Sequence, residues 1–103
     1  MPSVVDELHA CEARAAKIAI DREQKYRLCT ILGKSRIQYV LDPLTSGELC
    51  VFAPTVDMLC EASQVCQGLR GVLEPGDALD EVMEVQAIVD RVAMRLVETT
   101  VQT

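Results

Sequence analysis

The sequence is poor in aromatic residues, with one Phe, two Tyr and no Trp. Aromatic side chains bury large areas and often dominate a core. Valine, leucine, isoleucine and alanine must therefore build the core of this chain, whose 103 residues are enough for one domain. The sequence also has a single histidine, His9, so little of it is suited to acid–base chemistry at neutral pH.

The chain lacks any apolar run long enough to span a bilayer, and no signal-like basic segment opens it. Its cysteines are odd in number and include no C-x-x-C pair; they are Cys11, Cys29, Cys50, Cys60 and Cys66. Each lies among apolar neighbours, which is typical of a reduced thiol used as a small hydrophobic residue. We therefore expect a cytoplasmic protein with no disulfide and no contact with a membrane.

Basic charge is scarce, and the net charge is −6. Binding to nucleic acid needs clustered cations, so we expect no nucleic-acid partner. The basic residues concentrate in one segment, where Asp21 and Glu23 are interleaved with them; they are Arg22, Lys25, Arg27, Lys34 and Arg36. As an anion site this segment is weak. It is better suited to a protein interface, facing the acidic C-terminal helix of another copy.

One string imitates a phosphate-binding loop. Gly33 is followed by Lys34 and Ser35, but that motif needs a glycine five residues earlier, where this chain has Leu28. The motif should also open a helix, whereas we expect this string to close one. We therefore predict no cofactor and no small-molecule substrate.

The candidate metal ligands and nucleophiles are badly spaced. His9 and Cys11 are two residues apart, and Cys60 and Cys66 are six apart, so on helices each pair points to different sides. The carboxylates of the last helix lie where the helix dipole favours acid; they are Asp77, Asp80, Glu81 and Glu84. We predict no metal site and no catalytic residue, and hence a protein that is not an enzyme.

The periodicity predicts a predominantly helical α+β domain. We expect a long helix at about 3–32, capped by Ser3 and ended by Gly33, and two further helices at about 55–70, capped by Thr55, and 77–98, capped by Asp77. Between them, at 36–53, two β-branched and aromatic runs flank a Pro/Ser/Gly turn, which indicates a β-hairpin. The alternative for 36–53 is a pair of short helices, which would make the chain an all-α helical bundle.

A helix with a wide apolar stripe is stable in water only when that stripe is covered. The rest of the chain is too short to cover the whole stripe of a helix over 3–32. We therefore expect its N-terminal face to bind a protein partner or a second copy in a homodimer. That face comprises Val4, Leu8, Cys11, Ala15, Ile18 and Ala19. The sequence thus favours a protein–protein interaction module, such as an adaptor or a structural subunit of an assembly. The alternatives are a small acidic chaperone for a dedicated client and a small cysteine-dependent enzyme or metal-binding protein.

Overall fold

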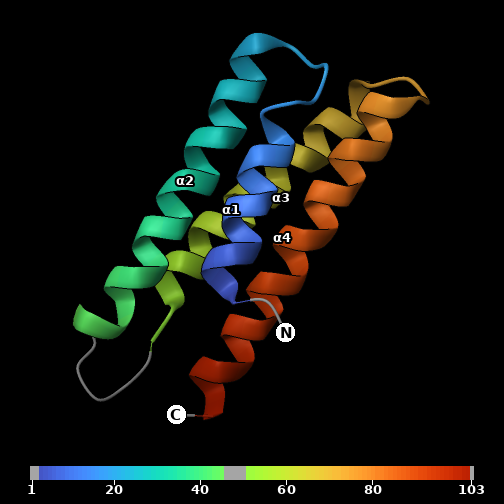
Figure 1. Cartoon of the computed structure of the whole chain (residues 1–103). Helices are drawn as coiled ribbons and strands as arrows, with labels where there is room; N and C mark the ends of the chain where they lie inside the picture. Colours follow the sequence, from blue (N-terminus) through green and yellow to red (C-terminus); the bar gives the residue numbers. More distant parts are fainter. Residues whose placement is uncertain (1–2, 46–50, 103) are drawn as a thin grey trace.

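The computed structural model describes residues 3–45 and 51–102, with residues 101 and 102 described by their backbone alone. Four helices make up nearly all of this part: α1 (Val4–Ala15), α2 (Arg22–Thr45), α3 (Ala53–Val72) and α4 (Asp77–Gln102) (Figure 1). The described residues contain no strand. The predicted α+β class is therefore wrong, and the alternative, an all-α helical bundle, is the observed fold.

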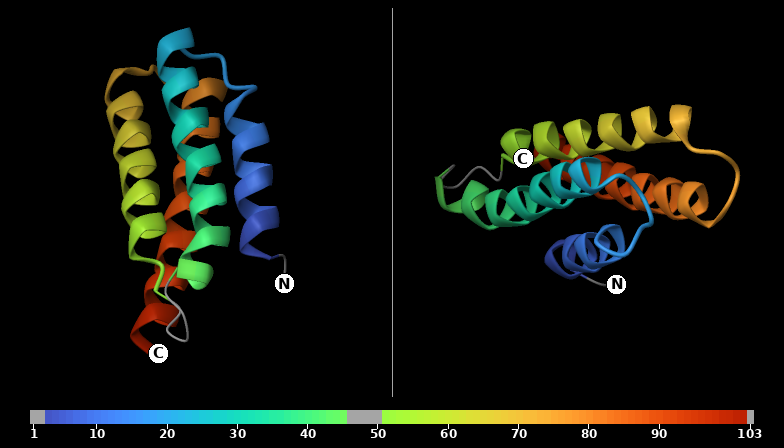
Figure 2. Two further views of the ribbon diagram at one scale, coloured as in Figure 1. Left: turned by 90° about the vertical axis from the view of Figure 1, so that its left-hand side faces the viewer. Right: turned by 90° about the horizontal axis from the view of Figure 1, so that it is seen from above.

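The helices form a closed ring of packing partners. Each helix contacts two neighbours, in the order α1, α2, α3, α4 and back to α1. Successive helices run in opposite directions, so α2 and α4 point the same way from diagonal corners (Figures 1 and 2). The bundle measures 46 × 23 × 20 Å. None of the helices described is both long and apolar enough to cross a membrane.

The predicted helix over 3–32 is two helices. Its start is confirmed, because the Ser3 hydroxyl accepts a hydrogen bond of 3.1 Å from the amide of Asp6. The helix ends at Ala15, and α2 begins after Asp21, whose carboxylate accepts from the amide of Gln24 at 3.2 Å. Asp21 thus serves as the N-cap of α2. The reversal lets the apolar faces of α1 and α2 pack against each other.

The predicted hairpin over 36–53 is also wrong. Residues 36–45 continue α2, residues 46–50 lie outside the described part, and residues 51 and 52 lead into α3. Gly33 sits inside α2 and does not end it. The buried Ser35 is accommodated within this helix because its hydroxyl donates to the carbonyl of Ile31 at 2.8 Å. Pro43 is tolerated because it lies in the last turn, where only one helical hydrogen bond is lost.

The helices predicted at 55–70 and 77–98 correspond to α3 and α4, although their caps differ from the prediction. α3 begins at Ala53, and Phe52 occupies the N-cap position, so Thr55 lies inside the first turn. In α4 the carbonyl of Gly76 accepts the first helical bond, from the amide of Asp80 at 3.1 Å. Gly76 is therefore the N-cap, and Asp77 is the first residue of the helix.

Aliphatic side chains fill the core, as the composition predicts. Leu8, Leu28, Leu32 and Leu59 are fully buried, together with a valine stripe along α4 that consists of Val82, Val85, Val89 and Val92. The rings of Tyr39 and Phe52 stack at the edge of this core, with centroids 5.3 Å apart.

Candidate protein-binding surface

The face predicted to bind a partner is turned inward. Val4, Leu8, Cys11, Ala15 and Ile18 are at most 4% exposed, and only Ala19, in the link after α1, lies at the surface. Helices α2 and α4 cover this face within the chain. The argument for a binding surface here depended on an uncovered helix over 3–32, and no such helix exists.

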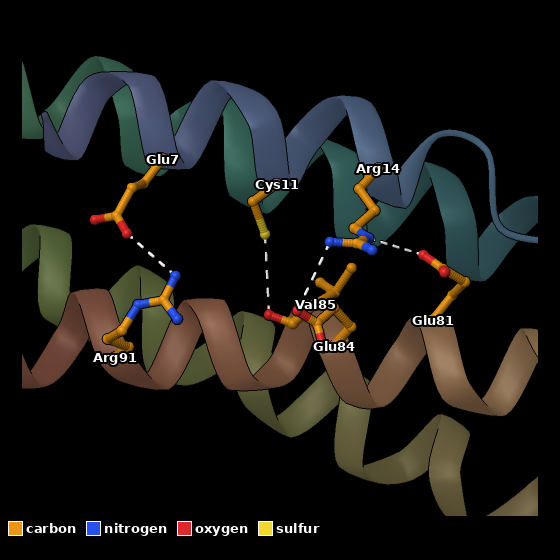
Figure 3. Close-up of polar contacts among 7 residues, drawn as sticks. All are labelled: Glu7, Cys11, Arg14, Glu81, Glu84, Val85 and Arg91. Atoms are coloured by element: carbon orange, nitrogen blue, oxygen red, sulfur yellow. Dashed lines mark hydrogen bonds and ion pairs between the residues drawn. The ribbon is translucent and has the colours of Figure 1, made fainter. Parts of the chain in front are cut away.

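Ion pairs fix α1 on its neighbours. Glu7 accepts from Arg91 and from Arg95 of α4, each at 3.1 Å, and Arg14 donates to Glu81 at 2.9 Å (Figure 3). On the other side, Glu12 pairs with Arg36 of α2 at 3.3 Å. An ion pair contributes measurably to stability when its groups are partly buried and well aligned or when several charges form a network. Glu7 meets these conditions, because its side chain is largely buried and lies between two arginines. α1 is therefore an integral helix of the bundle.

The buried thiols are unsuited to nucleophilic chemistry. Burial raises the pKa of Cys11 to about 12 and that of Cys66 to about 11, so both stay protonated at neutral pH. The Cys11 thiol points at the carbonyl of Val85, 3.9 Å away, whereas His9 is exposed (Figure 3). In the described part of the chain, no three His, Cys, Asp or Glu side chains converge as metal ligands. Cys50 lies outside that part.

Two open grooves follow the helix pairs. One, of about 340 Å³, lies between α2 and α3 beside Arg27 and Gly68, and the other, of about 570 Å³, lies between α1 and α4 beside Ala10 and Glu81. Neither groove brings together a histidine, a cysteine or a pair of carboxylates. They therefore lack the convergent polar groups that mark a catalytic or ligand site.

The outer side of α2 carries a line of apolar and small residues, four of which are exposed. We call it the α2 outer face and define it as Tyr26, Thr30, Gly33, Ile37, Val40 and Leu44, with Leu41 beside it. The intervals of four and three residues alternate, as they do along the seam of a coiled coil. Tyr26 is 74% exposed and Leu44 75%, while Ile37 and Val40 are each more than half exposed. Four of the nine large apolar side chains exposed in the described residues belong to this face and Leu41 adjoins it, so it is the main apolar surface there.

Charge sets α2 apart from the rest of the protein. α2 carries five basic and two acidic residues, a net charge of +3, in a chain whose net charge is −6. One of the two acids, Asp42, is buried. Arg27 and Lys34 flank the α2 outer face and form no ion pair with any residue in the described ranges. An apolar line with basic flanks is thus the distinctive surface of this chain.

The sequence contained the signal for this face. The alternating spacing from Tyr26 to Leu44 is legible, but a helix end assigned at Gly33 and a hairpin assigned after Arg36 divided it. The small residues Thr30 and Gly33 also interrupt the apolar pattern in the middle.

No known family model matches the chain, and no curated protein or solved structure shows significant similarity to it. The function must therefore be argued from the surface itself.

Proposed function

We propose that this protein is a protein–protein interaction module, a small adaptor or structural subunit, and that it binds a partner helix along the α2 outer face. The observation that carries the proposal is a set of four exposed apolar side chains at coiled-coil spacing on the outer side of α2, namely Tyr26, Ile37, Val40 and Leu44.

Burial provides the driving force. Removing apolar area from water contributes about 25 cal/mol per Å², and Tyr26, Ile37, Val40 and Leu44 are all at least half exposed in the single chain. These four side chains span more than five turns of α2. Tyr26 belongs to a residue type that is enriched among the anchors that dominate binding at interfaces, and the aliphatic side chains add apolar area around it.

The spacing favours a helix as the bound element. A partner helix crosses at about 20° when its side chains fit between residues spaced three and four apart, so the contact extends along the whole helix. Thr30 and Gly33, in the middle of the line, are half-buried, and the carboxylate of Glu12 from α1 lies over Gly33. The partner helix therefore contacts mainly the exposed side chains on either side of these two residues.

Site-specific photo-cross-linking tests the proposal. A photoreactive residue at Ile37 should give a discrete protein adduct in cells that make the protein, and adding Val40→Glu should abolish that adduct. The same photoreactive residue at Gln67, which is exposed on α3, is the matched control and should give none. Equal adducts at the two positions, or an Ile37 adduct that Val40→Glu leaves intact, would contradict the proposal.

A further inference from the structure

A second apolar line runs along the outer side of α4. We call it the α4 outer face and define it as Met83, Ala87, Asp90, Met94 and Val97. Its intervals of four and three residues match those of the α2 outer face. Met94 is 60% exposed, and Met83 and Val97 are exposed as well. The two faces and the adjoining Leu41 hold eight of the nine large apolar side chains that are exposed in the described residues, and the ninth, Val72, lies at the end of α3.

The two faces carry opposite charge. α4 has six acidic and two basic residues, a net charge of −4, against +3 on α2. Both basic residues of α4, Arg91 and Arg95, bind Glu7 of α1. The exposed acids Glu84 and Glu98 flank the α4 outer face, much as Arg27 and Lys34 flank the α2 outer face. Opposite potentials of this kind guide two surfaces together and select their register.

The direction of the helices suits a contact between copies. α2 and α4 run the same way at opposite corners of the bundle, so a copy displaced sideways presents its α4 parallel to α2 without being turned over (Figures 1 and 2). In the parallel register that aligns Ile37 with Met94, Val40 aligns with Val97 and Arg27 aligns with Glu84, while Lys34 is level with Arg91, whose guanidinium pairs with Glu7. The apolar C-terminal halves then meet, and the basic N-terminal half of α2 meets the acidic N-terminal half of α4.

A groove lies beside the C-terminal part of the α4 outer face, where Leu44 of the other copy would be placed. Between α3 and α4 a hollow of about 170 Å³ is lined by Ala53, Val56, Val97 and Thr100 among others. Leu44, the most exposed side chain of the α2 outer face, comes level with this groove in the parallel register.

We infer that the partner helix is α4 of a second copy, so that the α2 outer face of one chain binds the α4 outer face of the next. This inference rests on the proposed function of α2 and names its occupant. Because the two faces are different surfaces on different helices, the contact is heterologous, and copies add one after another into a ring or a filament. An α2–α2 pair would leave the basic half of each face without an acidic partner.

Two single variants test this geometry. Val40→Glu disables the α2 outer face, and Met94→Glu disables the α4 outer face; both side chains are more than half exposed, so the fold should tolerate each change. Wild type and the control Gln67→Glu should sediment faster as their concentration rises. Each single variant alone should remain a monomer at every concentration. An equimolar mixture of the two variants should form a dimer and stop there, because each variant supplies the face that the other lacks.

Each other result has a definite meaning. A wild type that stays monomeric at millimolar concentration would overturn the inference, while an Ile37 adduct to a different protein would leave the proposed function standing. Dimerisation of Met94→Glu alone would show an α2–α2 contact, which also overturns it. Circular dichroism verifies that each variant is folded. If Val40→Glu proves unfolded, Arg27→Glu replaces it, since this reversal places an acid level with Glu84 of the other copy and should prevent association at low salt. Wild-type association should weaken as salt is raised.

Discussion

At the scale of single residues, Asp42 connects two helices that the sequence gives no reason to join. Its carboxylate is 1% exposed and lies at the end of α2. It accepts from the amide of Thr55, 3.3 Å away, from the Thr55 hydroxyl, and from the side-chain amide of Gln38. Phe52, at the N-cap position of α3, has no side-chain group to cap that helix. Asp42 therefore caps α3 from a neighbouring helix.

Replacing Asp42 by alanine should destabilise the bundle. The change leaves the amide and hydroxyl of Thr55 buried without an acceptor, and hydrogen bonds to a charged group contribute about 1.5–3 kcal/mol. We expect Asp42→Ala to lower the free energy of unfolding by about that amount, measured by chemical denaturation. Asp57→Ala is the control, because Asp57 is exposed and lies close to Thr55 in α3. This replacement should change the free energy of unfolding by at most about 0.5 kcal/mol. Equal losses in the two variants would refute the capping role.

The buried thiols should make stability fall at alkaline pH. Cys11 and Cys66 have pKa values of about 12 and about 11 in the folded chain, against 9.0 for an unperturbed thiol, and burial is the main cause. Above pH 9 the unfolded chain therefore loses protons that the folded chain keeps, so the free energy of unfolding decreases as pH rises. Each thiol contributes a slope of about 1.4 kcal/mol per pH unit, present between pH 9 and 11 and absent at neutral pH.

Denaturation curves between pH 7 and 11 measure this slope. The double variant Cys11→Ala/Cys66→Ala should be less stable at neutral pH because of the cavities it creates, but its decline above pH 9 should be shallower by about 2.7 kcal/mol per pH unit. Tyrosines and lysines contribute equally to both proteins. An unchanged slope would mean that the two thiols ionise in the folded chain as readily as in the unfolded one.

At the scale of elements, α1 depends on its neighbours. A helix of 12 residues is marginal in water on its own, so α1 owes its stability to α2 and α4. Ala15 lies on its buried face and is 0% exposed, while Ala13 lies on the outer face of the same turn. These two alanines allow a clean comparison between the inner and outer sides of one helix.

Ala15→Glu should unfold the chain or lower its stability by more than about 3 kcal/mol, because an unpaired carboxylate would enter the core. Ala13→Glu, with the same change of size and charge, should cost about 0.5 kcal/mol or less. Circular dichroism during urea titration distinguishes the two. If Ala15→Glu were as stable as Ala13→Glu, the inner face of α1 would have to be exposed in solution.

The elements also show what sequence patterns can and cannot settle. Ser3, the break at residues 74–76 and the stripes of α3 and α4 are local signals, and they gave two of the four helices and the start of α1. The end of α1 was missed because Asp21 fits two local patterns. It could form an ion pair with Lys25 within one long helix, or it could cap a new helix that begins at Arg22. Only the packing of α1 against α2 decides between these patterns. The hairpin prediction was wrong for a related reason. Short β-branched runs are compatible with a strand or with a helix, and only the burial of Ser35 and Asp42 on one side of α2 identifies the helix.

The face of α1 predicted to bind a partner is buried, because the long helix on which that prediction depended is absent. Its residues have the correct helical spacing, and the face they form is apolar, as expected. Whether such a face is covered by its own chain depends on where the chain turns back, which no local pattern records. Once α1 ends at Ala15, the same side chains become core, and the uncovered face moves to α2.

At the scale of the whole molecule, charge is segregated along with the apolar surface. α2 carries +3, so the remaining residues together carry −9. A molecule with one basic side and an acidic opposite side attracts its own copies in one orientation and repels them in others.

This arrangement predicts that thermal stability depends on protein concentration. Binding that occurs only in the folded state stabilises it by about 2.7 kcal/mol when the concentration of free partner is 100 times the dissociation constant. For a domain of about 100 residues, each 1 kcal/mol raises the midpoint of thermal unfolding by roughly 4–8 °C. Calorimetry over a hundredfold range of concentration should therefore show a rising midpoint for wild type and for Gln67→Glu. The midpoint of Val40→Glu should stay constant, because that variant cannot offer its α2 outer face. A midpoint that rises equally in Val40→Glu would place the contact between copies elsewhere on the bundle, and a constant midpoint in wild type would show that folded copies do not bind each other.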